Sequence, residues 1–229
     1  MPNYIANVVK MKGIAHLPLF DTEDGKKCFD FNKIIPMPES LNIESSSRTE
    51  QAIVYYLTNR CLIPLGCLDE DTHKIIDNTV KNMFSKNWAQ EVFTRTSEWA
   101  YKARPYEQDK LYSDGEKYVN NYKNYGATTW YDWCIANWGT KWNAGSNIGI
   151  DNNTIGFHTA WDMPEPVITK LSQMYPDKEV EIWWADEDRG SNTGHAIYKN
   201  GQLISGGPNK NSSNEAYEMY NYCWSINGQ

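Results

Sequence analysis

The sequence predicts an α+β fold, namely a ferredoxin-like antiparallel sheet with helices on one face and a large helical insertion after the first strand. Strand-like alternation of apolar and polar residues occurs near the N-terminus and again after residue 154. A long stretch with helical spacing separates these two regions. Each expected helix has one apolar stripe to bury, and an antiparallel sheet with helices on it buries such stripes. The order of elements is close to a split ferredoxin-like arrangement.

The first strand is expected within residues 3–14, NYIANVVKMKGI, where apolar and polar positions alternate loosely. Residues 15–48 contain PMPES and ESSS, which are typical of loops, and we expect them to be irregular. Residues 1–48 are therefore interpreted as the first strand and a loop of the ferredoxin-like domain.

Residues 49–127 are interpreted as the helical insertion. Apolar residues recur at helical spacing in three stripes, and residues 107–122 are expected to form a fourth helix. Pro105 is expected to end the third helix, because proline cannot donate to the helix ladder. The stripes are Ile53, Tyr56, Leu57 and Cys61; Ile76, Val80, Met83 and Phe84; and Ala89, Val92, Phe93, Thr96, Ala100 and Ala103.

The stretch TTWYDWCIANWGTKWNA, residues 128–144, carries four of the ten tryptophans. Thr129 and Asp132 form a plausible N-terminal capping pair, and Gly139 is a natural helix stop. A helix that is apolar around most of its circumference is normally buried. We therefore expect these tryptophans to lie in a core rather than on a display surface.

Residues 128–229 are expected to complete the ferredoxin-like domain. A strand over 154–161 precedes a helix capped by Asp162, and a strand over 179–185 puts Val180, Ile182 and Trp184 opposite Glu179, Glu181 and Trp183. Asn200-Gly201 between two apolar runs predicts a hairpin. Ser212 and Glu215 are expected to cap a last helix with the stripe Ala216, Met219, Tyr220, Cys223 and Trp224.

The composition argues against several classes of partner. The net charge is −7 with a pI of about 5.2, so the chain has few cations to displace counterions from a nucleic-acid backbone. Its five cysteines form no CxxC pair, which favours a reduced compartment. No signal peptide is visible, and the apolar runs are too short to span a bilayer. We expect a cytoplasmic protein without membrane or nucleic-acid partners.

Three dispersed motifs carry a resemblance to a known family: FDFNKIIPMPESL (29–41), WYDWCIANWGTKWNA (130–144) and FHTAWDMPEPVITKLSQMYP (157–176). They resemble the YubB-like ferredoxin-like proteins of plasmids and phages. The resemblance implies a ferredoxin-like domain and a place on a mobile element or in a bacterium that carries one. It implies no chemistry. The motif residues Phe29, Phe31, Trp130, Trp133, Trp138, Trp142 and Trp161 are interpreted as packing positions.

Few residues suggest catalysis. His158 and His195 lie on expected strands and could approach each other across the sheet, but two histidines without a third ligand are a weak metal or acid–base signal. The Asp186–Asp188 turn is interpreted as solvated rather than as a cation site. Cys134 sits on an aromatic helix, which argues for burial rather than nucleophilic reactivity. We expect no metal and no cofactor.

The leading hypothesis is a non-enzymatic accessory protein of a phage or plasmid, in the host cytoplasm, that binds and inhibits a host or defence-system protein. Its partner-binding residues would be Glu179, Glu181, Trp183, Asp186, Glu187 and Asp188. The alternative is a nucleotide-binding or nucleotide-processing protein that uses His158, His195 and the Asp186–Asp188 turn. The sequence alone leaves both open.

Overall fold

The computed structural model describes residues 3–23, 26–57, 105–149 and 151–226. The chain divides into two compact units: unit 1 is Met1–Met37 with Cys134–Gln229, and unit 2 is Pro38–Trp133. Unit 2 begins and ends outside the helical insertion expected at 49–127. The two apolar stripes expected within 76–103, and Cys61 of the first stripe, lie outside the described residues.

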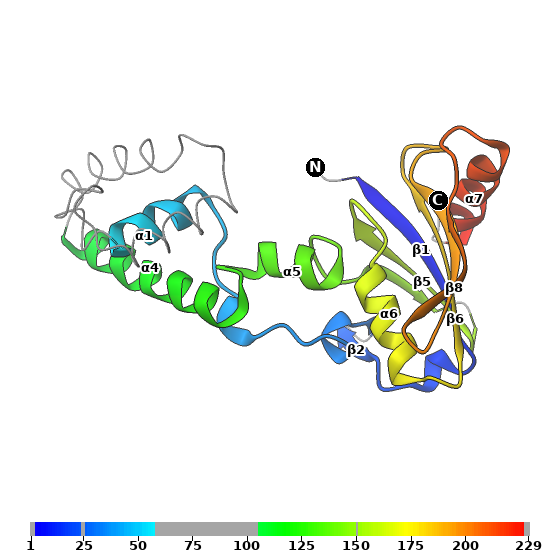
Figure 1. The fold of residues 1–229 in the computed structure, drawn as a ribbon, viewed down its shortest axis with the longest axis horizontal. Coiled ribbons are helices and arrows are strands. Elements are labelled where there is room, and N and C mark those ends of the chain that lie inside the picture. The colour runs from blue at the N-terminus through cyan, green and yellow to red at the C-terminus, as the bar shows by residue number, and fades with distance from the viewer. Residues whose placement is uncertain (1–2, 24–25, 58–104, 150, 227–229) are drawn as a thin grey trace. The chain divides into compact units, whose positions relative to one another are not determined.

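Unit 1 is built on a six-stranded sheet with the order β4-β5-β1-β6-β7-β8, in which every neighbouring pair is antiparallel (Figure 1). The first strand of the chain lies near the middle, between two strands that follow the helical insertion. The predicted antiparallel sheet is confirmed. The strands are β1 Tyr4–Lys10, β4 Gly145–Gly149, β5 Thr154–Ala160, β6 Glu179–Asp186, β7 Thr193–Lys199 and β8 Gln202–Pro208.

Two helices pack on opposite faces of this sheet, α6 (Glu165–Met174) and α7 (Asn214–Ile226) (Figure 1). Tyr198 pairs with Val180 and donates its hydroxyl to Glu165 of α6 at 3.1 Å, which defines the α6 face. The α7 face carries Ala6, Val8 and Ala185, which cluster with Cys223 and Trp224 of α7. The expectation of helices on one face is thus corrected. The strand residues that point to the α7 face are also apolar, so a helix packs against that face as well.

Four aromatic rings fill the core of the α6 face. Phe29, Phe31 and Phe157 lie 5.2–5.8 Å from one another between ring centroids, and Trp138 lies 5.7 Å from Phe31. Edge-to-face and tilted pairs at this spacing are favourable. The first two of these phenylalanines come from the segment expected to be irregular, so that segment carries core residues.

The segment 15–48 is more regular than predicted. Strands β2 (Phe20–Glu23) and β3 (Lys26–Phe29) pair as a separate antiparallel hairpin in which Glu23 faces Lys26. Short 3-10 turns occupy Ile14–His16, Phe31–Lys33 and Glu39–Leu41. The dipeptide Asp24-Gly25 in the sequence is a strong hairpin signal that could have predicted this pairing.

The tryptophan-rich helix is α5, Trp130–Trp138. Its predicted ends are confirmed: the Thr129 hydroxyl accepts from the backbone N–H of Tyr131 at 3.3 Å, and Gly139 ends the helix with a φ of 76°. Trp133 and Trp138 are buried, as expected.

Three other tryptophans interpreted as packing positions are less enclosed. Trp130 and Trp142 are only half-buried. Trp161 is 40 % exposed, which corrects its interpretation as a core residue. It follows the last residue of β5 with a φ of 76°, so the chain turns there and the indole leaves the alternating apolar face.

Unit 2 contains helices α1 (Ser47–Leu57) and α4 (Pro105–Tyr125), which pack together through Ala52, Ile53, Tyr55, Leu111, Tyr118 and Val119. Gly115 lets the two backbones approach, because a Cβ there would overlap the carbonyl of Ala52. Pro105 begins α4, since proline is well tolerated at a first helical position; the helix that it was expected to end lies outside the described residues. No helix in the described part of the chain is long and apolar enough to cross a membrane.

The C-terminal elements follow their predicted signals closely. Asn200 and Gly201 have positive φ values of 49° and 77° and join β7 to β8, which confirms the hairpin. The caps differ by one or two residues. Ser213 rather than Ser212 accepts from the backbone N–H of Ala216, and α6 begins after Pro164 rather than at Asp162.

Candidate functional site

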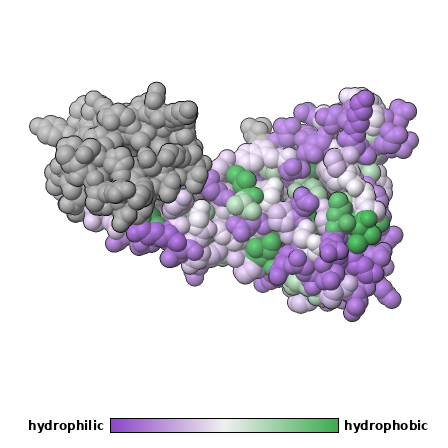
Figure 2. All heavy atoms as spheres, in the orientation of Figure 1, coloured by the Kyte–Doolittle hydropathy of each residue, from purple (hydrophilic) through white to green (hydrophobic). Residues whose placement is uncertain are grey.

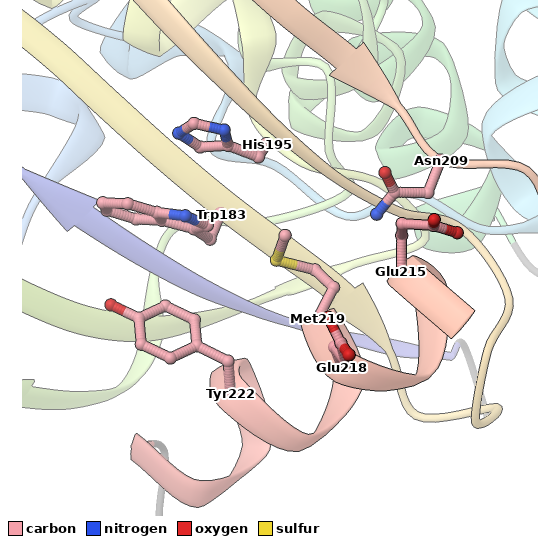
Figure 3. A pocket seen from close by; sticks show the side chains of 7 residues that line it. All are labelled: Trp183, His195, Asn209, Glu215, Glu218, Met219 and Tyr222. Carbon is pink, nitrogen blue, oxygen red and sulfur yellow. The ribbon is translucent and has the colours of Figure 1, made fainter. Parts of the chain in front are cut away.

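A cavity of about 540 Å³ opens on the α7 face of unit 1, and we call it the α7 pocket. Figure 3 shows an aromatic end and a polar end, with the Met219 side chain between them. The lining residues come from strands β6 and β7, the turn after β8 and helix α7: Trp183, His195, Asn209, Glu215, Glu218, Met219 and Tyr222.

Local periodicity explains how these residues converge. Glu215, Glu218, Met219 and Tyr222 have the spacing i, i+3, i+4, i+7, which puts them on one face of α7. Trp183 points toward α7 because successive strand residues alternate between the two faces of the sheet. His195 is its direct partner on β7 and points the same way. The pocket therefore forms where one helix face meets one sheet face.

The aromatic end is fixed by stacking and one hydrogen bond. The His195 ring lies nearly parallel to Trp183, with centroids 5.0 Å apart and an interplanar angle of 15°. Tyr222 contacts the same indole at 5.5 Å and 64°. His195 Nε2 lies 2.8 Å from Glu181 Oε1, and this hydrogen bond fixes the imidazole in its stacked position on the indole. Burial, with Cys223 and Glu181 nearby, raises the pKa of Tyr222, so its phenol stays protonated at neutral pH.

The polar end presents hydrogen-bond acceptors. Hydrogen bonds from its own backbone N–H and from Ser213 lower the pKa of the exposed Glu215 carboxyl, which stays ionised. Glu218, also exposed, adds a second carboxylate one helical turn further on. Asn209 adds an amide, whose Nδ2 donates to Thr193 Oγ1 at 3.2 Å and whose carbonyl oxygen is a further acceptor. Among the residues that the structure describes, no lysine or arginine lines the pocket.

The predicted partner-binding residues fall into different environments. Trp183 lines the pocket, and Glu181 lies behind it, bonded to His195. Glu179 is exposed at the start of β6 and pairs with Lys199 at 3.4 Å. Asp186 is buried and accepts from Asn3 Nδ2 and from the Asp188 backbone N–H, so it organises the turn. Glu187 and Asp188 are exposed in that turn.

The two histidines of the nucleotide hypothesis do not meet. His158 lies on β5 and His195 on β7, with β1 and β6 between them, so roughly 14 Å of sheet separates them. His158 packs instead against Trp224 and Tyr4, at 5.1 and 6.1 Å between ring centroids. The expectation that they approach each other is wrong, because sequence order does not reveal which strands intervene.

Two observations on the described residues concern metal binding and nucleophilic chemistry. Within them, no three His, Cys, Asp or Glu side chains are grouped so that they could hold a metal ion. Cys134 is buried, as expected, and this burial raises its pKa to about 12, so the thiol stays protonated at neutral pH.

Five pocket residues escaped sequence reasoning: Asn209, Glu215, Glu218, Met219 and Tyr222. In the last helix, Glu215 was expected only as a cap and Met219 only as part of the apolar stripe. Two carboxylates, a methionine and a tyrosine of this helix recur at helical spacing in the sequence. This spacing is the signal that could have predicted the α7 side of the pocket.

The fold defines the class of protein first: an α+β protein with a ferredoxin-like antiparallel sheet and a helical unit inserted after its first strand. Residues 137–227 match the family described as a ferredoxin-like domain in Api92-like protein. A solved structure, the protein api92 from Yersinia pseudotuberculosis, aligns with 13 % sequence identity and a TM-score of 0.38, covering 93 % of this chain and 100 % of that one. No curated protein matches the chain.

Proposed function

We propose that the chain is a non-enzymatic binding protein that engages a bacterial protein partner through its α7 face. The observation that carries this proposal is the α7 pocket, in which an aromatic wall adjoins two exposed carboxylates and an amide. Concave sites of this kind, apolar with a few convergent polar groups, are the usual places for recognition. Trp and Tyr are also the side chains that most often dominate binding energy.

The chemistry of the described residues supports binding rather than catalysis. The buried Cys134 thiol stays protonated, and His158 and His195 stand on strands that are not neighbours. A nucleophile needs a base within hydrogen-bond reach, and the two histidines are too far apart for one to act as base for the other. A pocket lined by carboxylates also repels phosphates, which weighs against the nucleotide alternative.

The biological setting in this proposal comes from the resemblance to the YubB-like proteins of plasmids and phages. On that basis the chain is an accessory protein of a mobile element in the host cytoplasm, and its partner is a host or defence-system protein that it inhibits. The acidic character of the chain, −7 overall, favours a partner with a basic surface.

Affinity capture from a bacterial lysate tests this function. The tagged chain is compared with Glu215→Gln/Glu218→Gln, which removes the pocket charge, and with Glu39→Gln, a matched control at an exposed carboxylate of unit 2 outside the pocket lining. We expect the wild-type chain and the control to retain one protein partner and the double variant to lose most of it. Addition of nucleotides to the lysate should leave capture unchanged. Recovery of a bound nucleotide and no protein would overturn the proposal.

A further inference from the structure

We propose that the α7 pocket holds the side chain of a single lysine or arginine of the partner, with the cationic head at Glu215 and Glu218 and the alkyl stem over Met219 and Trp183. This inference rests on the proposed function and gives it a ligand chemistry. Three independent features of the pocket support it: its charge, the order of its lining residues and its size.

Charge selects a cation. Glu215 and Glu218 line the cavity, and no lysine or arginine of the described part of the chain lines it beside them. Their oxygens accept hydrogen bonds and cannot donate when ionised, and the hydrogen bonds to Glu215 keep that carboxyl ionised. A lysine ammonium has three N–H donors and an arginine guanidinium has five, and neither has an acceptor. Such a head group therefore brings both the positive charge and the N–H donors that the two carboxylates accept.

The order of the lining residues selects an alkyl cation over a bare ion. Figure 3 shows Met219 between the carboxylates and the rings of Trp183 and Tyr222. Lysine and arginine bury their methylene stems along apolar surface while the charged head stays at a polar site. Met219 is a flexible thioether that adapts to such a stem. An inorganic cation would leave this apolar wall unused.

The size and openness of the pocket favour a side chain presented by a protein over a free small molecule. A cavity of about 540 Å³ exceeds what one such side chain fills, and the excess volume accommodates the flanking residues of a peptide. Glu215, Glu218 and Tyr222 are all exposed, so a folded partner can reach them. The Trp183–His195 stack, fixed by Glu181, forms a pre-organised wall that loses little freedom on binding.

Titration of the full-length chain with matched small probes tests the charge requirement. The probes are n-butylguanidinium, n-butylammonium and the neutral isostere n-butylurea, followed by NMR of the Trp183 indole N–H and the Met219 methyl group. We expect both cations to shift these two signals and butylurea to bind at least tenfold more weakly. Equal binding of butylurea would overturn the inference, since it would show an apolar site without charge selection.

Variants locate the site. Glu215→Gln/Glu218→Gln should weaken butylguanidinium at least tenfold, Trp183→Leu about fivefold, and the control Glu39→Gln less than twofold. Circular dichroism checks that each variant is folded, and the exposed positions of the two glutamates on α7 make them tolerant of this change. Unchanged affinity in the double variant would overturn the assignment of the head group to these carboxylates.

A short peptide separates the two sources of the cation. Acetyl-Gly-Arg-Gly-amide should bind at least as tightly as free n-butylguanidinium, because its backbone uses the remaining volume; at least tenfold weaker binding of the peptide would overturn the protein source. Failure of the function and failure of the site are distinguishable. Cation binding without a captured protein leaves the site in place and removes the proposed function. Capture that persists in Glu215→Gln/Glu218→Gln keeps the function and removes the site.

Discussion

Trp183 and Trp184 are neighbours in the chain and belong to opposite faces of the sheet. Trp184 is 4 % exposed and lies on the α6 face with Val180 and Ile182, both fully buried. Trp183 is half-buried on the α7 face, where it stacks with His195 at the wall of a cavity. The same strand therefore supplies one face with packing and the other with a recognition surface.

The difference between the faces lies in how completely they are covered. On the α6 face, aromatic side chains from outside the sheet close the core around Phe157. On the α7 face, a single helix covers Ala6, Val8 and Ala185 and leaves the β6–β7 region open beside it. Figure 2 shows hydrophilic residues over α7 and a hydrophobic patch over β8, where Leu203 and Ile204 are 51 % and 57 % exposed. An incomplete cover leaves polar and aromatic groups accessible together.

The largest expected effect is the contrast between Trp184→Ala and Trp183→Ala in stability. Loss of the buried indole leaves a cavity and should lower the free energy of unfolding by about 3–5 kcal/mol. Loss of the half-buried indole should cost about 1 kcal/mol, because less apolar area returns to water. Urea unfolding measures both. Equal destabilisation would show that the two faces do not differ in packing.

A second contrast uses glycines. A Cβ at Gly194 would overlap the six-membered ring of Trp184, whereas one at Gly145 meets nothing closer than the His158 carbonyl oxygen at 3.9 Å. Gly194→Ala should therefore destabilise the fold by about 1–3 kcal/mol through overpacking. Gly145→Ala should change stability by about 0.5 kcal/mol or less. Thermal unfolding of the two variants compares a closed face with an open edge.

A double-mutant cycle over Glu181→Gln and His195→Gln measures what holds the wall of the pocket. The two groups are 2.8 Å apart, and their side chains are 28 % and 34 % exposed, so solvent screens part of the interaction. We expect a coupling free energy of about 0.5–1 kcal/mol in unfolding experiments. Each single variant should also weaken butylguanidinium binding, since the Trp183 ring loses its support. A coupling of zero with unchanged binding would show that the hydrogen bond does not organise the site.

The smallest effect concerns pH. Burial lowers the pKa of His158, and its Nε2 atom is buried without a hydrogen-bond partner among the described residues. The unfolded chain takes up this proton near the ordinary value of about 6.5, while the folded chain takes it up at lower pH. Stability contributed by the neutral ring is therefore lost as the pH falls below about 6.5. His158→Phe should flatten this part of the stability profile; an unchanged slope would assign it to other groups.

Much of unit 1 could be predicted because its signals are local. Alternation separated Trp183 from Trp184, and Asn200-Gly201 specified the hairpin between β7 and β8. The order of strands could not be predicted, because β1 pairs with residues 144–181 positions away, from Lys10 with Thr154 to Ile5 with Asp186, and no local pattern encodes such pairing. This strand order separates His158 on β5 from His195 on β7 by two strands. The pocket was predicted only in part. Trp183 was expected at a surface, but the α7 residues beside it belong to a distant element, and their approach depends on the fold.

The place of β1 also bears on synthesis. Strand β1 leaves the ribosome before both strands that it pairs with, and the second of them is complete only once residues through Asp186 have been made. Helices α1 and α4, by contrast, have their shared core by residue 125. During translation, helices α1 and α4 can therefore pack together while β1 is still without the strands that it pairs with in the sheet.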